Sequence, residues 1–137
     1  MRKASGDSKR DSGTPVLVVG KSTKTGLPLL DRCEFSATPC LNARDALKML
    51  STGRHQAVLC DLEMPGTGGM VLSDNVCADF PNVAVVVITP PGKLRQGILA
   101  MIAGASGYIQ MPLQPQTVVA SLRSALQRKR LDAAMRR

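Results

Sequence analysis

Short apolar runs alternate with amphipathic stretches five times along this chain of 137 residues. Runs at residues 16–19, 57–61, 83–89 and 107–110, and a weaker one at 34–38, have the length and composition of buried strands. Strands joined through helices run parallel, and such a sheet carries helices on both faces. The alternation therefore predicts one α/β domain, a doubly wound three-layer sandwich with a parallel sheet of order 2-1-3-4-5.

The stretches between the runs have helical spacing near residues 27–33, 42–50, 69–80, 93–103 and 114–130. Asn42, with Asp45 three residues later, predicts a helix N-cap. Pro115 opens the last helix, which we expect to end near Arg130. We expect the most apolar run, 83–89, at the centre of the sheet. The inward side chains predicted for the helix over 69–80 are Met70, Val71, Val76 and Cys77.

The net charge of +8 is concentrated at the two ends of the chain. Residues 15–122 are nearly neutral, whereas residues 1–14 and 131–137 read as a disordered basic arm and a basic tail around a domain over 15–130. Such ends favour solubility, and as an alternative they suit contact with nucleic acid. Only 2% of the residues are aromatic and none interleaves the basic ones, which disfavours stacking on single strands and argues against nucleic acid as a partner.

Cysteine usage and hydropathy point to the cytoplasm. Cys33, Cys40, Cys60 and Cys77 form no close pair and accompany a single histidine, a pattern typical of reduced thiols rather than a zinc site. No apolar run approaches the roughly 18 residues of a membrane span. The first 14 residues lack the apolar stretch of a signal peptide.

The run over residues 57–61 ends in a single carboxylate, Asp61, and Met64, Pro65 and Gly66 follow at once. A strand that delivers one acid to its carboxyl end and then turns away builds a reactive site at the switch point beside strands 1 and 3. Three further features follow in order: Thr89 at the end of the fourth strand, GASGY at 104–108, and Met111-Pro112. Over residues 15–130 the chain resembles the receiver domains of bacterial response regulators, whose fold is flavodoxin-like.

This resemblance implies a role for several residues. Asp61 would be the phosphoacceptor, and Thr89 and Tyr108 the switch pair that reports its state. Pro112 would follow a cis peptide bond. From the residues alone, Thr89 equally fits an ordinary strand residue and Tyr108 a packing residue.

The chain departs from the receiver pattern at three positions. Gly20 and Lys21 stand where receivers carry the acidic pair that holds Mg²⁺, and Met111 stands where they carry a phosphate-binding lysine. Mg²⁺ prefers carboxylates and water. A lysine about 5 Å from a divalent ion costs on the order of several kcal/mol at an effective dielectric near 20. We therefore expect no bound metal and no cofactor; the weaker alternative is a Mg²⁺ site made by Asp61 and Glu63. Lys21 either pairs with Asp61 or points into solvent.

These patterns predict a single-domain, non-enzymatic receiver-like protein of a two-component phosphorelay. We expect a pseudo-receiver that binds a protein partner with little or no Mg²⁺-dependent phosphorylation. The alternative is a working phosphoacceptor fed by a histidine kinase. The predicted partner face comprises Lys93, Arg95, Tyr108, Gln116 and Leu122.

Overall fold

The computed structural model describes residues 13–20, 28–30, 32–64 and 68–135. Within these residues the chain forms one parallel sheet of order β2-β1-β3-β4-β5, as the sequence predicted. The strands are β1 (Thr14–Val19), β2 (Phe35–Cys40), β3 (Ala57–Asp61), β4 (Ala84–Thr89) and β5 (Gly107–Gln110). The helices are α3 (Ala43–Leu50), α4 (Gly69–Asp79), α5 (Leu94–Ile102) and α6 (Pro115–Met135).

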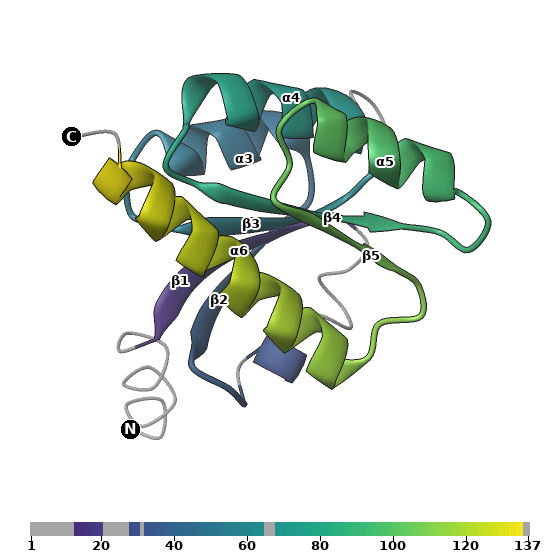
Figure 1. Ribbon diagram of the computed structural model, residues 1–137, viewed down its shortest axis with the longest axis horizontal. Coiled ribbons are helices and arrows are strands. Elements are labelled where there is room, and N and C mark those ends of the chain that lie inside the picture. Colours follow the sequence, from purple (N-terminus) through teal and green to yellow (C-terminus); the bar gives the residue numbers. More distant parts are fainter. Residues whose placement is uncertain (1–12, 21–27, 31, 65–67, 136–137) are drawn as a thin grey trace.

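The sheet lies between two helical layers (Figure 1). Helices α3, α4 and α5 cover one face, and α6 covers the other together with the short helical segment 28–30. Alternate residues of each strand point to opposite faces. In β3, for example, Leu59 packs in the cluster under α6 and Val58 in the cluster under α3 and α4. The predicted three-layer sandwich is confirmed.

Asn42 caps α3 as predicted, because its side-chain oxygen accepts a hydrogen bond of 2.9 Å from the amide of Asp45. The bounds of β3 and β5 also agree with the prediction. Strand β1 begins at Thr14, inside the stretch predicted as an arm.

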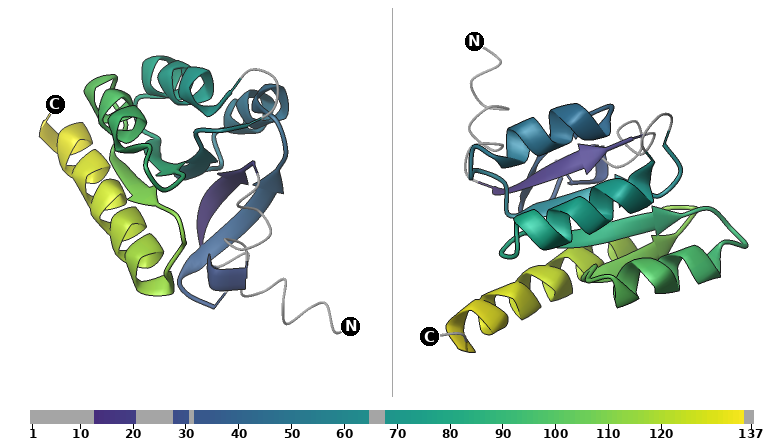
Figure 2. Two further views of the ribbon diagram at one scale, coloured as in Figure 1. Left: turned by 90° about the vertical axis from the view of Figure 1, so that its right-hand side faces the viewer. Right: turned by 90° about the horizontal axis from the view of Figure 1, so that it is seen from above.

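Three predictions about the elements are wrong. The central strand is β3, and β4 lies beside it. The unbroken apolar run of β4 was a poor guide, because such a run indicates burial on both faces of the sheet and not the place of the strand in the sheet order. In α4, Val71 faces solvent while Leu72 and Ser73 are buried. Helix α6 continues to Met135, past the predicted end near Arg130, and its last turns extend beyond the strands (Figure 2).

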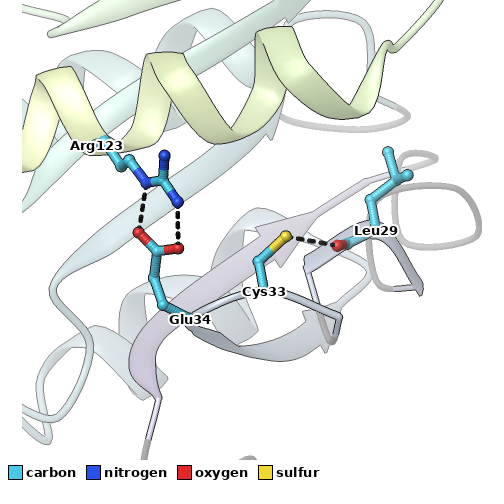
Figure 3. Close-up of polar contacts among 4 residues, drawn as sticks. All are labelled: Leu29, Cys33, Glu34 and Arg123. Carbon is cyan, nitrogen blue, oxygen red and sulfur yellow. Dashed lines mark hydrogen bonds and ion pairs between the residues drawn. The ribbon is translucent and has the colours of Figure 1, made fainter.

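An ion pair ties α6 to the start of β2 (Figure 3). Arg123 donates from Nε and Nη2 to the two carboxylate oxygens of Glu34, at 2.6 and 2.8 Å. The hydrogen bonds from Arg123 hold the pKa of Glu34 below its usual value. Beside this pair, the Cys33 thiol donates to the carbonyl of Leu29 at 3.5 Å. The pair is at the amino ends of the strands, so it leaves the opposite edge of the sheet unobstructed.

None of the four cysteines is in a disulfide, as the sequence predicted. Cys40 and Cys60 are buried, whereas Cys33 and Cys77 are half-buried. Burial raises the pKa of the Cys60 thiol to about 12. The thiol next to Asp61 in sequence is therefore protonated and unreactive at neutral pH. No helix in the described part of the chain is both long enough and apolar enough to cross a bilayer.

Candidate functional site

Strand β3 carries Asp61 to the carboxyl edge of the sheet. Its neighbours in the sheet are β1, which leads into Gly20, and β4, in which Ile88 pairs with Asp61. The ladder continues one step further, because the Leu62 amide donates to the Ile88 carbonyl at 2.9 Å. The Asp61 residue is only 8% exposed. The Asp61 carboxylate therefore lies at the predicted switch point of the sheet. Neighbouring residues cover most of its surface.

Gly20 is part of that cover. Its amide donates to the Cys40 carbonyl at 3.0 Å, and its backbone adopts φ +99°, in the left-handed region. A Cβ atom built on Gly20 would lie 2.9 Å from Asp61 Oδ2 and 3.2 Å from Met64 Cγ. The backbone at position 20 therefore lies directly against the carboxylate. A side chain of any kind, including the carboxylate that the resemblance implies for this position, would be strained in this backbone conformation and would push against Asp61.

The residues of this edge do not fit a resident Mg²⁺ ion. Within residues 13–20, 28–30, 32–64 and 68–135, no three Asp, Glu, His or Cys side chains gather as a metal site. Glu63, the weaker candidate ligand, has a side chain that is 53% exposed, and it lies 3.8 Å from the ammonium of Lys93. Lys21, Pro65 and Gly66, which the sequence placed in the site, lie outside the described residues. Mg²⁺ is usually bound by one or two well-placed carboxylates together with several waters, and here one of the two candidates, Glu63, is exposed and lies beside a cation.

Thr89, the predicted switch residue, ends β4 and is completely buried. Its hydroxyl oxygen has no hydrogen-bond partner among the described residues. A buried hydroxyl left without a partner costs about 1–3 kcal/mol. The structure thus keeps a polar group at this strand end at a cost in stability.

Tyr108, predicted to form a switch pair with Thr89, lies on the neighbouring strand β5. The two strands pair with Val87 opposite Tyr108. A Cβ atom built on Gly97 of α5 would lie 2.9 Å from Tyr108 Cδ2 and 3.4 Å from Thr89 Cγ2. Thr89, Tyr108 and the backbone of α5 therefore meet at Gly97, with Tyr108 37% exposed. The sequence analysis missed Gly97, although a glycine inside a helical pattern is a signal of close approach.

Met111 and Pro112 close this edge of the sheet. The peptide bond between them is cis, as the resemblance implied for Pro112. The Met111 amide donates to the Thr89 carbonyl at 2.8 Å, and its side chain packs against the apolar cluster under α6. Met111, which stands where the resemblance implies a phosphate-binding lysine, therefore contributes an apolar contact.

Four of the five residues predicted for the partner face are exposed. They are Lys93, Arg95, Tyr108 and Gln116. The fifth prediction, Leu122, is wrong: this side chain is fully buried in the cluster between α6 and the sheet. Leu122 lies on the same side of α6 as Val118 and Ala125, four before and three after it, and that spacing marks the core-facing stripe.

Two basic side chains of α6 bind backbone carbonyls. Arg128 donates to the Ser106 carbonyl, and Lys129 Nζ donates to the Pro81 carbonyl at 3.0 Å. Both bonds tie α6 to loops that precede strands. Part of the positive charge that the sequence left open to nucleic acid is therefore used within the domain.

Comparison with known proteins gives one consistent family. The family model for the response regulator receiver domain matches residues 27–123, a stretch that begins after β1 and Gly20. The chain is similar to the response regulator UvrY of Escherichia coli K12, at 31% identity over 90 residues, which are 66% of this chain and 41% of UvrY. It is also similar to chemotaxis protein CheY-3 of Vibrio cholerae, at 36% identity over 85 residues, which are 61% of this chain and 65% of that protein.

Among solved structures, a receiver domain protein of Clostridium thermocellum superposes with a TM-score of 0.79 at 26% identity, covering 86% of this chain and 98% of that one. The chain spans less than two thirds of the length of the two curated relatives above. The likeness therefore concerns the receiver part of those proteins.

Proposed function

Because the chain belongs to the response regulator receiver domain family, we propose that it serves two-component signalling as an atypical receiver. In this proposal it acts through contact with a protein partner, with little or no Mg²⁺-dependent phosphorylation of Asp61. It has no catalytic turnover and no resident cofactor, and its place of action is the cytoplasm.

The observation that carries the proposal is the contact between Gly20 and Asp61. Phosphoryl transfer to a carboxylate depends on positioning and on neutralising charge, and Mg²⁺ supplies most of that charge in related sites. Here glycine occupies the position expected for an acidic ligand, and a Cβ built on it would lie 2.9 Å from Asp61 Oδ2. The next residue is Lys21, a cation in place of the second acid. Met111 removes a third contact to a phosphoryl group.

A receiver without a stable phosphorylated state has no ligand with which to shift its conformational populations. Its binding surface must then be competent at rest, and its output follows its abundance or that of its partner. The exposed residues Lys93, Arg95, Tyr108 and Gln116 are candidates for that surface. A histidine kinase is a second candidate partner, bound without transfer.

One observation favours the second candidate function, a working phosphoacceptor. The buried Thr89 hydroxyl has no hydrogen-bond partner among the described residues, and it lies at the end of the strand next to Asp61. A phosphoryl oxygen would offer that hydroxyl an acceptor. In this second reading Asp61 accepts a phosphoryl group from a histidine kinase, and Thr89 and Tyr108 respond to it.

A titration with Mg²⁺ separates the two. We expect amide chemical shifts around Gly20, Asp61 and Glu63 to stay constant up to millimolar Mg²⁺ at matched ionic strength. The control is Asp61→Asn, since a shift that persists in this variant does not come from the carboxylate. Saturable shifts at these residues, absent from Asp61→Asn, would support the phosphoacceptor reading and contradict ours.

A further inference from the structure

A groove crosses the amino edge of the sheet, opposite the edge that carries Asp61. Its larger part has a volume of about 380 Å³ and lies between α6 and the starts of β1 and β2. A smaller part of about 160 Å³ lies between α6 and the residues before β3 and β4. The two parts meet at Leu126 and Arg130, which line both. Pockets for small ligands have volumes of about 300–1,000 Å³, so the larger part alone is large enough for one.

Polar side chains line this groove from two directions. The sheet contributes the residues at or just before four strand starts, which are Thr14, Glu34, Gln56 and Asn82. Helix α6 contributes three residues that are spaced four and three apart and therefore share one side of the helix: Arg123, Gln127 and Arg130. Neighbouring strands are about 4.8 Å apart, so four strand starts span roughly 14 Å. This length suits a small molecule better than an extended chain.

The ion pair described above holds one of the groove's cations in place. Arg123 Nε and Nη2 donate to the Glu34 carboxylate, and Nη1 does not contact it (Figure 3). A guanidinium has five N–H groups, so three of those of Arg123 are not used by Glu34. A donor that is already fixed in position costs less entropy when a ligand binds.

Other polar groups of the groove have free hydrogen-bonding capacity. The side chains of Gln56, Gln127 and Arg130 take part in no hydrogen bond or ion pair between the described residues. Lys129 lines the smaller part, and its Nζ donates one hydrogen bond of 3.0 Å to the Pro81 carbonyl. An ammonium has three N–H groups, so two of those of Lys129 are not used by this carbonyl.

The charge of the groove indicates the kind of ligand. Among the described residues that line it, Arg123, Lys129 and Arg130 are cations and Glu34 is a carboxylate, which leaves a charge of +2. A phosphate monoester carries about −1.5 to −2 charges at pH 7, so it matches this excess. Guanidinium groups also suit phosphate in shape, because they donate two parallel hydrogen bonds to its oxygens.

We propose that this groove binds a phosphate monoester of a small polar alcohol, the chemistry shared by sugar phosphates and nucleoside monophosphates. The phosphate oxygens accept hydrogen bonds from Arg130 and from the N–H groups of Arg123 that Glu34 leaves free. The side chains of Gln56 and Gln127 bond with the polar groups of the alcohol. The inference goes beyond the proposed function, because the groove lies at the other edge of the sheet from Asp61 and binding there needs no phosphoryl transfer.

Titrations of the full chain at matched ionic strength, followed by amide chemical shifts, test the proposal. The probes are glucose 6-phosphate and adenosine 5′-monophosphate, with glucose, adenosine and inorganic phosphate as controls. We expect at least one monoester to bind saturably at millimolar concentration, with shifts centred on residues 14, 34, 56 and 123–130. Its parent alcohol and inorganic phosphate should bind at least tenfold more weakly. Failure of both monoesters to bind, equal binding of either control, or shifts centred on Asp61 would overturn the proposal.

Matched variants locate the ligand. Arg130→Gln removes one charge from the groove and should weaken monoester binding about tenfold, whereas Arg44→Gln changes an exposed arginine of α3 and should leave binding within about twofold. Gln127→Glu adds a negative charge inside the groove and should weaken binding about tenfold. Asn75→Asp makes the same kind of change on an exposed residue of α4 and should have little effect. Identical effects within either pair would refute the assigned groove.

Two further measurements separate this groove from other binding modes. Asp61→Asn should bind the monoester as tightly as the parent protein does, and a loss of binding in this variant would overturn the proposal in favour of the carboxyl edge. A DNA duplex should bind more weakly than the monoester at physiological salt. Tighter binding of the duplex, lost in Arg130→Gln, would overturn the proposal in favour of nucleic acid.

Discussion

Replacing Gly20 tests the contact on which the functional argument depends. The Gly20→Ala side chain would be placed 2.9 Å from Asp61 Oδ2 and 3.0 Å from Asp61 Cβ, on a backbone with φ +99°. Left-handed backbone at a residue other than glycine costs about 1–3 kcal/mol. Forcing an extra carbon into filled space costs about 1–3 kcal/mol more. We therefore expect Gly20→Ala to lower the free energy of unfolding by about 2–6 kcal/mol.

Gly53 provides the matched control. Its φ of +78° is also left-handed, but a Cβ there meets nothing within 4 Å. Gly53→Ala therefore carries backbone strain alone. The difference between the two variants isolates the contact with Asp61, and it should be about 1–3 kcal/mol.

Gly20→Asp restores the residue type of a receiver and adds a second carboxylate near Asp61. Two like charges about 5 Å apart repel by about 3 kcal/mol at an effective dielectric of 20. This variant should be less stable than Gly20→Ala at neutral pH. The assay is urea unfolding, in which a lower midpoint at constant slope reports lost stability. Equal losses in Gly20→Ala and Gly53→Ala, or a Gly20→Asp protein as stable as the parent, would refute the reasoning.

Three other positions give independent predictions. Asn42→Ala should lower the free energy of unfolding by about 1 kcal/mol because it removes the α3 cap, whereas Asn42→Asp keeps the acceptor and most of the stability. An unchanged urea midpoint in Asn42→Ala would contradict the cap. Thr89→Val should raise the free energy of unfolding by about 1 kcal/mol because it removes an unpaired buried hydroxyl, and Thr89→Ser, which keeps the hydroxyl, should not. A loss of stability in Thr89→Val would show that the hydroxyl has a partner. Burial raises the pKa of Cys60 from 9.0 to about 12, so the folded protein keeps this proton above pH 9 while the unfolded chain releases it. Stability should then fall by about 1.4 kcal/mol per pH unit above pH 9 from this group, and the loss between pH 8 and pH 10 should be smaller in Cys60→Ala; equal losses would contradict the burial argument.

The sequence predicts the sheet well because its strand ends carry distinct signals. Asp61 ends the third apolar run and a turn follows it, so the bounds of β3 agree with the prediction. Gly107 and the Met111-Pro112 pair bracket β5 in the same way. Asn42 marks the start of α3 through the chemistry of its side chain.

The helix faces are harder to predict, for reasons visible in the residues. Met70, Val71 and Leu72 are consecutive and apolar, so the pattern fixes no single inward side in α4. The buried face of α5 consists of Gly97 and Ala100. The ring of Tyr108, on β5, fills the space that a side chain at position 97 would need, so a small residue faces the sheet there. The end of α6 was misjudged because its basic run resembles a tail, whereas arginine, lysine, leucine and alanine all favour helix.

The candidate site divides in a similar way. The resemblance to receiver domains singles out Asp61, Thr89 and Tyr108, and the structure places Asp61 and Thr89 at the ends of neighbouring strands. The covering of Asp61 by Gly20 depends on a close approach between the residue that follows β1 and the end of β3, which no local sequence pattern encodes. At Gly97 the backbone of α5 approaches both Thr89 and Tyr108. This close approach becomes visible only when α5 is placed on the sheet.

The central claim is that this receiver does not form a Mg²⁺-dependent phosphorylated state at Asp61. The most direct measurement is the intact mass of the protein after incubation with a small-molecule phosphodonor and Mg²⁺, with Asp61→Asn treated in parallel. We expect the parent protein to keep its unmodified mass, as the variant does. Addition of one phosphoryl group to the parent and none to Asp61→Asn would contradict it.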